Sequence, residues 1–123
     1  MARLSPHFEA HEFDSHDGVQ APPRFLYWAQ KLCRGQLEPL RREFGAVTVI
    51  SGFRTFGHND DVGGAPSSYH LRIPGRRGAA VDLRCARGAP RDWYELLDAR
   101  GCPGLGLYDD HVHADNRRGR ARW

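Results

Sequence analysis

The chain has 123 residues, of which 40% are hydrophobic and 27% charged, and its formal net charge is +3. This length and composition exclude a disordered polypeptide and predict one domain, residues 1–123, with a core that is stable without disulfide bonds or other cross-links. The basic residues are almost all arginine and are not clustered on one segment, so we expect no nucleic-acid partner. We also expect a monomer.

We expect neither a thiolate metal site nor a secretion or membrane signal in this sequence. Cys33, Cys85 and Cys102 form no C-x-x-C pair, which favours buried free thiols over a thiolate zinc site. No apolar run approaches the ~20 residues of a transmembrane helix. The N-terminal residues MARLSPHFEAHEF contain no hydrophobic signal-peptide region. We therefore expect no membrane partner and synthesis in the cytoplasm.

Residues 1–20 are polar and rich in histidine. The three histidines are His7, His11 and His16. No acidic or thiol residue stands at a ligand-like spacing from them, so metal binding is the less favoured interpretation. We expect an N-terminal arm that packs Phe8 and Phe13 onto the domain.

A helix is predicted to begin at Pro22-Pro23, because proline is tolerated in the first helical turn. Apolar residues then recur at three- and four-residue steps as far as Phe44, and Gly45 ends the helix. Gly35 and Pro39 should kink or split it, since an internal proline removes a hydrogen bond.

Short strands and one more helix are expected in the rest of the chain. The expected elements are a strand at 47–50, a helical turn at 58–62, a strand at 79–85, a helix from 90 to about 101, and strands at 105–108 and 111–115. Alternation along the strand 79–85 places Asp82 on the face opposite Val81 and Leu83. We expect Trp123, after a basic tail, to pack back as an anchor.

Three residues in separate segments have the chemistry of a metal site. His70, Asp82 and His113 offer two imidazoles and a carboxylate. This is a three-ligand set for Zn2+, which in catalytic sites keeps a fourth position open for water. One histidine alone would indicate little, but the combination predicts a zinc centre.

The motifs around these residues resemble a known family. They are Ser68-x-His70, Gly78-x-Ala80-x-Asp82, the stretch SGFRT at 51–55, and His111-Val112-His113. From Leu4 to Trp123 the chain is similar to the zinc D-Ala-D-Ala carboxypeptidases of the hedgehog-type metallopeptidase fold. Phage L-alanyl-D-glutamate endopeptidases belong to the same group. The resemblance implies an α+β domain with a small antiparallel sheet flanked by helices.

One departure from the family lies between the first two ligands. Family members usually place the histidine and the aspartate closer together than His70 and Asp82 stand here. The extra residues fall within Ile73–Arg77, and Pro74-Gly75 is a turn signal. We expect a lengthened loop that leaves the ligand ends in place.

Two residues are candidates for the general base. Asp110 stands three residues before His113, an arrangement that some family members use for this role, whereas His111 shares a strand face with the metal ligand. We favour Asp110 as the base and expect His111 to bond the water or the oxyanion. Many relatives carry an apolar aromatic residue at the position of His111.

Other polar residues are expected to bind the substrate or to stabilise the fold. Arg54 follows a buried strand within the family motif, so we expect it to grip a carboxylate or polarise the scissile carbonyl rather than to be a solvated surface arginine. Ser68 should hydrogen-bond the substrate. Asp115 is expected to hold a neighbouring strand or Arg117.

The resemblance implies a zinc peptidase that hydrolyses peptidoglycan stem peptides, most simply a D-Ala-D-Ala carboxypeptidase. An endopeptidase that cuts L-Ala-D-Glu, as phage endolysins do, is the alternative. A zinc-binding module without hydrolysis is a further one, although the acid and the second histidine beside the ligand argue against it. A cytoplasmic origin would require release or export to the cell wall by an unknown route.

Overall fold

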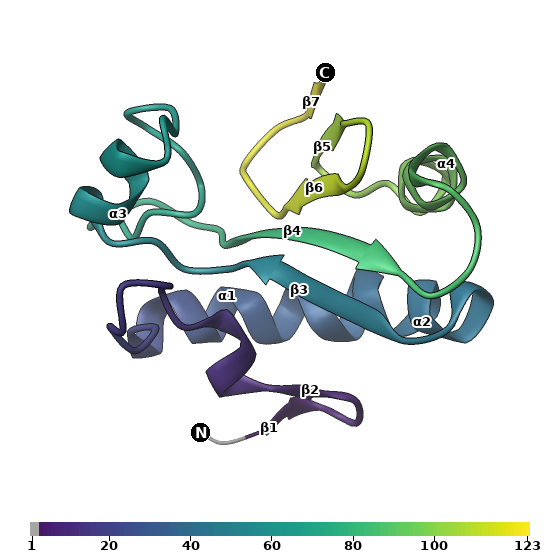
Figure 1. The fold of residues 1–123 in the computed structure, drawn as a ribbon, viewed down its shortest axis with the longest axis horizontal. Helices are drawn as coiled ribbons and strands as arrows, with labels where there is room; N and C mark the ends of the chain where they lie inside the picture. Colours follow the sequence, from purple (N-terminus) through teal and green to yellow (C-terminus); the bar gives the residue numbers. More distant parts are fainter. Residues whose placement is uncertain (1–2) are drawn as a thin grey trace.

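The computed structural model describes residues 3–123, so Met1 and Ala2 of the predicted arm lie outside the described residues. The fold is α+β, as predicted, with a five-stranded sheet and a two-stranded sheet (Figure 1). The strands are β1 (Arg3–Ser5), β2 (Phe8–Glu9), β3 (Val47–Ser51), β4 (Ala80–Cys85), β5 (Gly104–Leu107), β6 (Val112–Asp115) and β7 (Ala121–Arg122). The helices are α1 (Pro23–Leu32), α2 (Glu38–Phe44), α3 (Phe56–Asp61) and α4 (Pro90–Ala99).

The larger sheet has the strand order β3-β4-β6-β5-β7. Every neighbouring pair is antiparallel, as expected, except β5 and β7, which are parallel. The parallel pair forms because the tail returns alongside β5. The backbone N–H of Trp123 donates to the carbonyl of Leu105, and the N–H of Leu107 donates to the carbonyl of Trp123.

The predicted long helix is split, as its glycine and proline indicate. α1 passes into a π-helical turn at Cys33–Leu37, and α2 begins at Glu38 with Pro39 in its first turn. Gly45 ends α2 with a φ of 79°, a left-handed conformation that glycine adopts without steric cost. No helix in the described part of the chain is both long and apolar enough to cross a membrane.

The core lies on one face of the larger sheet. Val81 and Leu83 of β4 and Val112 and Ala114 of β6 are fully buried in it, together with side chains of α1 and α4. Because successive strand residues point to opposite faces, Asp82 of β4 and His113 and Asp115 of β6 alternate with these apolar side chains. The face opposite the core is therefore where the polar residues meet.

The N-terminal segment packs against the same core. Phe8 and Phe13 are fully buried, and Glu38 of α2 accepts hydrogen bonds from the hydroxyl of Ser5 at 2.6 Å and the backbone N–H of His7 at 2.8 Å. The short hairpin β1–β2 is thereby tied to the helical layer below β3 (Figure 1).

Candidate active site

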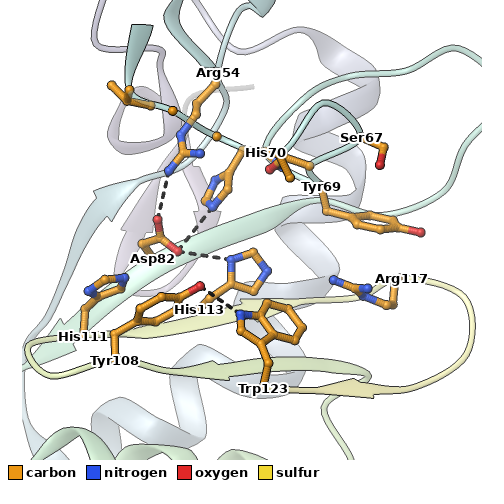
Figure 2. A pocket seen from close by; sticks show the side chains of 15 residues that line it. Arg54, Ser67, Tyr69, His70, Asp82, Tyr108, His111, His113, Arg117 and Trp123 are labelled. Atoms are coloured by element: carbon orange, nitrogen blue, oxygen red, sulfur yellow. Dashed lines mark hydrogen bonds and ion pairs between the residues drawn. The ribbon is translucent and has the colours of Figure 1, made fainter. Parts of the chain in front are cut away.

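Three predicted metal ligands meet on the open face of the sheet. Asp82 of β4 and His113 of β6 are register partners, and His70 comes from the loop between α3 and β4. His70 Nε2 lies 3.3 Å and His113 Nδ1 3.2 Å from Asp82 Oδ1 (Figure 2). All three residues are buried, and their potential ligand atoms lie within 4.8 Å of one another. The group therefore suits one shared cation.

Each imidazole is fixed through its other nitrogen. His70 Nδ1 donates to the carbonyl of Gly52 at 2.7 Å, and His113 Nε2 donates to Asp115 Oδ2 at 2.7 Å. These bonds select the tautomers in which His70 Nε2 and His113 Nδ1 are free to bind a metal, as outer-shell partners commonly do. Two such nitrogens and a carboxylate match the donor set of a catalytic zinc site.

The bond from His113 to Asp115 was not anticipated from the sequence. Asp115 does bind Arg117, as expected, through Nε at 2.9 Å and Nη2 at 2.7 Å. Its second role had a readable signal, because His113 and Asp115 stand two residues apart on one strand and therefore share a face. The carboxylate of Asp115 orients the His113 ring.

The pKa values of the group follow from burial and close pairing. Burial opposes ionisation of Asp82, but its close pairing with His113 and His70 outweighs burial and lowers the pKa of the carboxyl. Burial lowers the pKa of His70. At His113, burial is outweighed by hydrogen bonds with Asp115 and Asp82, which raise its pKa. An ionised carboxylate between two imidazoles makes the site attractive to a cation.

The lengthened loop folds against the turn that carries His70. The guanidinium of Arg76 donates to the carbonyls of Ser67 at 2.6 Å and Ser68 at 2.7 Å. The hydroxyl of Ser68 accepts from the backbone N–H of His70 at 3.1 Å. The extra residues thus brace the His70 turn, and His70 and Asp82 meet despite the longer connection.

Arg54 lies beside the metal group rather than at the free surface. Its Nε donates to Ser51 Oγ at 3.1 Å, Nη1 to Asn59 Oδ1 at 3.3 Å and Nη2 to Asp82 Oδ2 at 3.1 Å. Only 15% of the side chain is exposed. The interaction with a predicted metal ligand was not foreseen, and it fixes the guanidinium at the edge of the cavity.

The two candidate bases lie differently. His111 lines the cavity and stacks on Tyr108 with ring centroids 4.4 Å apart. The side chain of Asp110 is 82% exposed, and its Oδ1 accepts from His111 Nδ1 at 2.7 Å. β6 begins at Val112, so Asp110 belongs to the preceding turn. The geometry brings His111 to the cavity and places Asp110 behind it.

The metal group opens into a cavity of about 560 Å³. Arg54, Ser68 and His111 line it. Several residues that the sequence did not single out for the site also line it, and the large ones among them include Tyr69, Tyr108, Arg117 and Trp123. Trp123 Nε1 donates to the hydroxyl of Tyr108 at 2.8 Å, and its ring lies 5.0 Å from that of His113 (Figure 2). The returning tail therefore forms one wall of the cavity.

An α+β domain with a buried His/Asp/His group at an open cavity has the features of a metallopeptidase. The chain belongs to the Peptidase M15 family, whose model matches residues 3–115. A comparison with curated proteins finds no match. Family membership and the ligand group together support a zinc peptidase that acts on a peptide substrate.

Close packing beside Asp115 leads to a stability prediction. A Cβ on Gly104, the register partner of Asp115, would overlap with the carboxylate of Asp115. We expect Gly104→Ala to lower the free energy of unfolding by about 1–3 kcal/mol, the usual cost of overpacking. Urea unfolding measures the change. Gly35→Ala is the control, because a Cβ there meets nothing within 4 Å and should not destabilise the protein. Equal stability of the two variants would contradict the prediction.

Proposed function

We propose that this protein is a zinc-dependent D-Ala-D-Ala carboxypeptidase that acts, as a monomer, on peptidoglycan stem peptides of the cell wall. The observation that carries the proposal is the buried group of His70, Asp82 and His113 beside a cavity, in a chain of the M15 family. Cleavage between L-Ala and D-Glu is the alternative within the same chemistry.

Zinc, held by these three side chains, would supply a Lewis acid that polarises the scissile carbonyl and activates water near neutral pH. Peptide hydrolysis also needs a group that accepts a proton and returns it to the leaving amine. His111 faces the cavity, whereas Asp110 contacts the outer side of its ring. We therefore assign proton transfer to His111 Nε2 and ring orientation to Asp110, although the sequence alone favoured Asp110 as the base.

Two further residues would bind the substrate. Nη1 and Nη2 of Arg54 each carry a second N–H beyond those bonded to Asn59 and Asp82, and these can stabilise the oxyanion that develops during attack. The hydroxyl of Ser68 accepts a backbone bond and keeps its own hydrogen for a substrate carbonyl.

Digestion of purified peptidoglycan by the zinc-loaded protein tests the proposed function. Mass spectrometry of the released material should show free D-alanine and stem peptides shortened by one residue. Fragments that begin with D-Glu would instead establish the endopeptidase. Zinc-loaded protein that releases neither product would support a binding module without hydrolysis.

The role of Arg54 is tested by Arg54→Lys. Lysine keeps the charge but lacks the planar fork that holds Ser51, Asn59 and Asp82 together. We expect peptide hydrolysis to fall by about two orders of magnitude, the usual worth of one oxyanion donor, with zinc content unchanged. Arg84→Lys, at an exposed position of β4, is the matched control. Wild-type turnover in Arg54→Lys would show that Arg54 supports the structure and takes no part in hydrolysis.

A further inference from the structure

Arg117 is held rigidly at the wall of the cavity. It follows β6, and the carboxylate of Asp115 accepts from its Nε, its Nη2 and its backbone N–H, the last at 3.1 Å. Asp115 is itself fully buried and is anchored a second time by His113. The guanidinium is therefore fixed in both position and orientation.

Aromatic rings flank this guanidinium. Its central carbon lies 4.5 Å from the centroid of Tyr69 and 5.1 Å from that of Trp123. Figure 2 shows Arg117 between these two side chains. Stacking of this kind holds the plane of an arginine while its edges stay available for hydrogen bonds. The side chain is 23% exposed, so it can meet a ligand in the cavity.

One edge of the guanidinium has no partner among residues 3–123. Nε and Nη2 face Asp115, and Nη1 makes no hydrogen bond with any residue from 3 to 123. An open guanidinium edge offers two parallel N–H groups, the geometry that a carboxylate accepts. Among the described residues that line the cavity, Asp82 is the sole acidic one, and it is already paired with Arg54 and both histidines. Asp115 binds the Nε edge of Arg117, so the Nη1 edge is the part of the guanidinium that is open to a ligand in the cavity.

We propose that Arg117 binds a carboxylate of the peptide substrate and selects substrates that carry one near the scissile bond. This inference rests on the proposed peptidase function and specifies which substrates that site takes. Asp115 Oδ2 contacts both Arg117 and His113 at 2.7 Å, so a carboxylate on Arg117 would lie within about three residues of the metal group, given ~3.5 Å per extended residue. It could be the terminal carboxylate of the last residue or an acidic side chain.

Binding of uncleavable peptides to the zinc-loaded protein separates these sources. One pair of probes ends in D-Ala-D-Ala with a reduced scissile bond, as the free acid and as the C-terminal amide. A second pair has blocked ends and a reduced bond between L-Ala and D-Glu or its amide, D-Gln. Calorimetry should show at least one acid bound about tenfold or more tightly than its amide, the worth of a charge-assisted hydrogen bond. The pair that shows the difference identifies the source.

Arg117→Gln should abolish this preference and leave the affinity for the amides unchanged. Arg118→Gln removes the same charge from the exposed neighbouring residue and should retain the preference. If Arg117→Gln loses zinc or fails to fold, Arg117→Lys replaces it, and its preference should drop severalfold because lysine lacks the fork. An equal loss of affinity for acid and amide would mean that Arg117 only supports Asp115, and would overturn the proposal.

The two proposals can fail separately. Wild-type protein that cleaves peptidoglycan but binds each acid and its amide alike would refute the role of Arg117 and leave the peptidase function standing. Wild-type protein that prefers an acid through Arg117 but cleaves nothing would refute the hydrolytic function and leave the carboxylate site standing.

Discussion

Replacing His70 or His113 by alanine is expected to abolish both zinc binding and peptidase activity. Each imidazole provides one of three donors around a shared position, and the two remaining donors cannot hold a tetrahedral ion with an open fourth place. Metal analysis after dialysis should give one zinc per wild-type chain and none in either variant. Hydrolysis of peptidoglycan should fall to the level of the metal-free protein.

Thermal unfolding provides a readout that does not depend on activity. A metal that binds only the folded state raises the melting temperature, so a chelator should lower Tm in the wild type and leave it unchanged in both variants. His11→Ala, which changes an exposed histidine of the N-terminal segment, should behave as the wild type. Stoichiometric tight zinc in His70→Ala or His113→Ala would show that the ligand assignment is wrong.

Local sequence patterns were enough to predict much of the framework. The β-branched run that begins at Val47 forms β3, and Pro39 divides the helix where the missing N–H would break it. Alternation along β4 correctly placed Asp82 opposite Val81 and Leu83. These features depend on neighbours in the chain, and a single sequence contains that information.

Features that depend on contacts between distant segments were missed. The tail is short and basic and has no strand periodicity, so its parallel pairing with β5 could not be predicted. Tyr69 and Trp123 come from segments far apart in the sequence, and both lie against Arg117. The bond between Arg54 and Asp82 likewise depends on how the loop after β3 returns toward β4.

Which of Asp110 and His111 faces the cavity, and so can act as the base, depends on where β6 begins. Side chains alternate along a strand, so a shift of one residue in its start exchanges inward and outward positions. β6 begins at Val112, and the turn before it directs His111 to the cavity and leaves Asp110 exposed. No local pattern in the run Asp109–His113 determines that boundary.

Loss of the His111 imidazole is therefore expected to reduce peptide hydrolysis more than a change at Asp110 does. His111→Ala removes the proposed proton acceptor, and peptide hydrolysis should fall by roughly two to four orders of magnitude, the usual worth of general acid–base catalysis. Zinc should stay bound, because His111 is outside the ligand group. Asp110→Asn keeps the shape of the side chain and weakens only its bond to His111 Nδ1, so it should cost less.

A control variant of His111 separates the chemistry from the packing. His111→Phe keeps an aromatic ring that can stack on Tyr108 but cannot accept a proton, so it should be as inactive as His111→Ala. Kinetics on a stem peptide, with zinc content measured for each variant, gives the ranking. Near-normal turnover in His111→Phe together with an almost inactive Asp110→Asn would assign the proton transfer to Asp110. That result would require the turn before β6 to move when substrate binds, because Asp110 lies behind the imidazole in this structure.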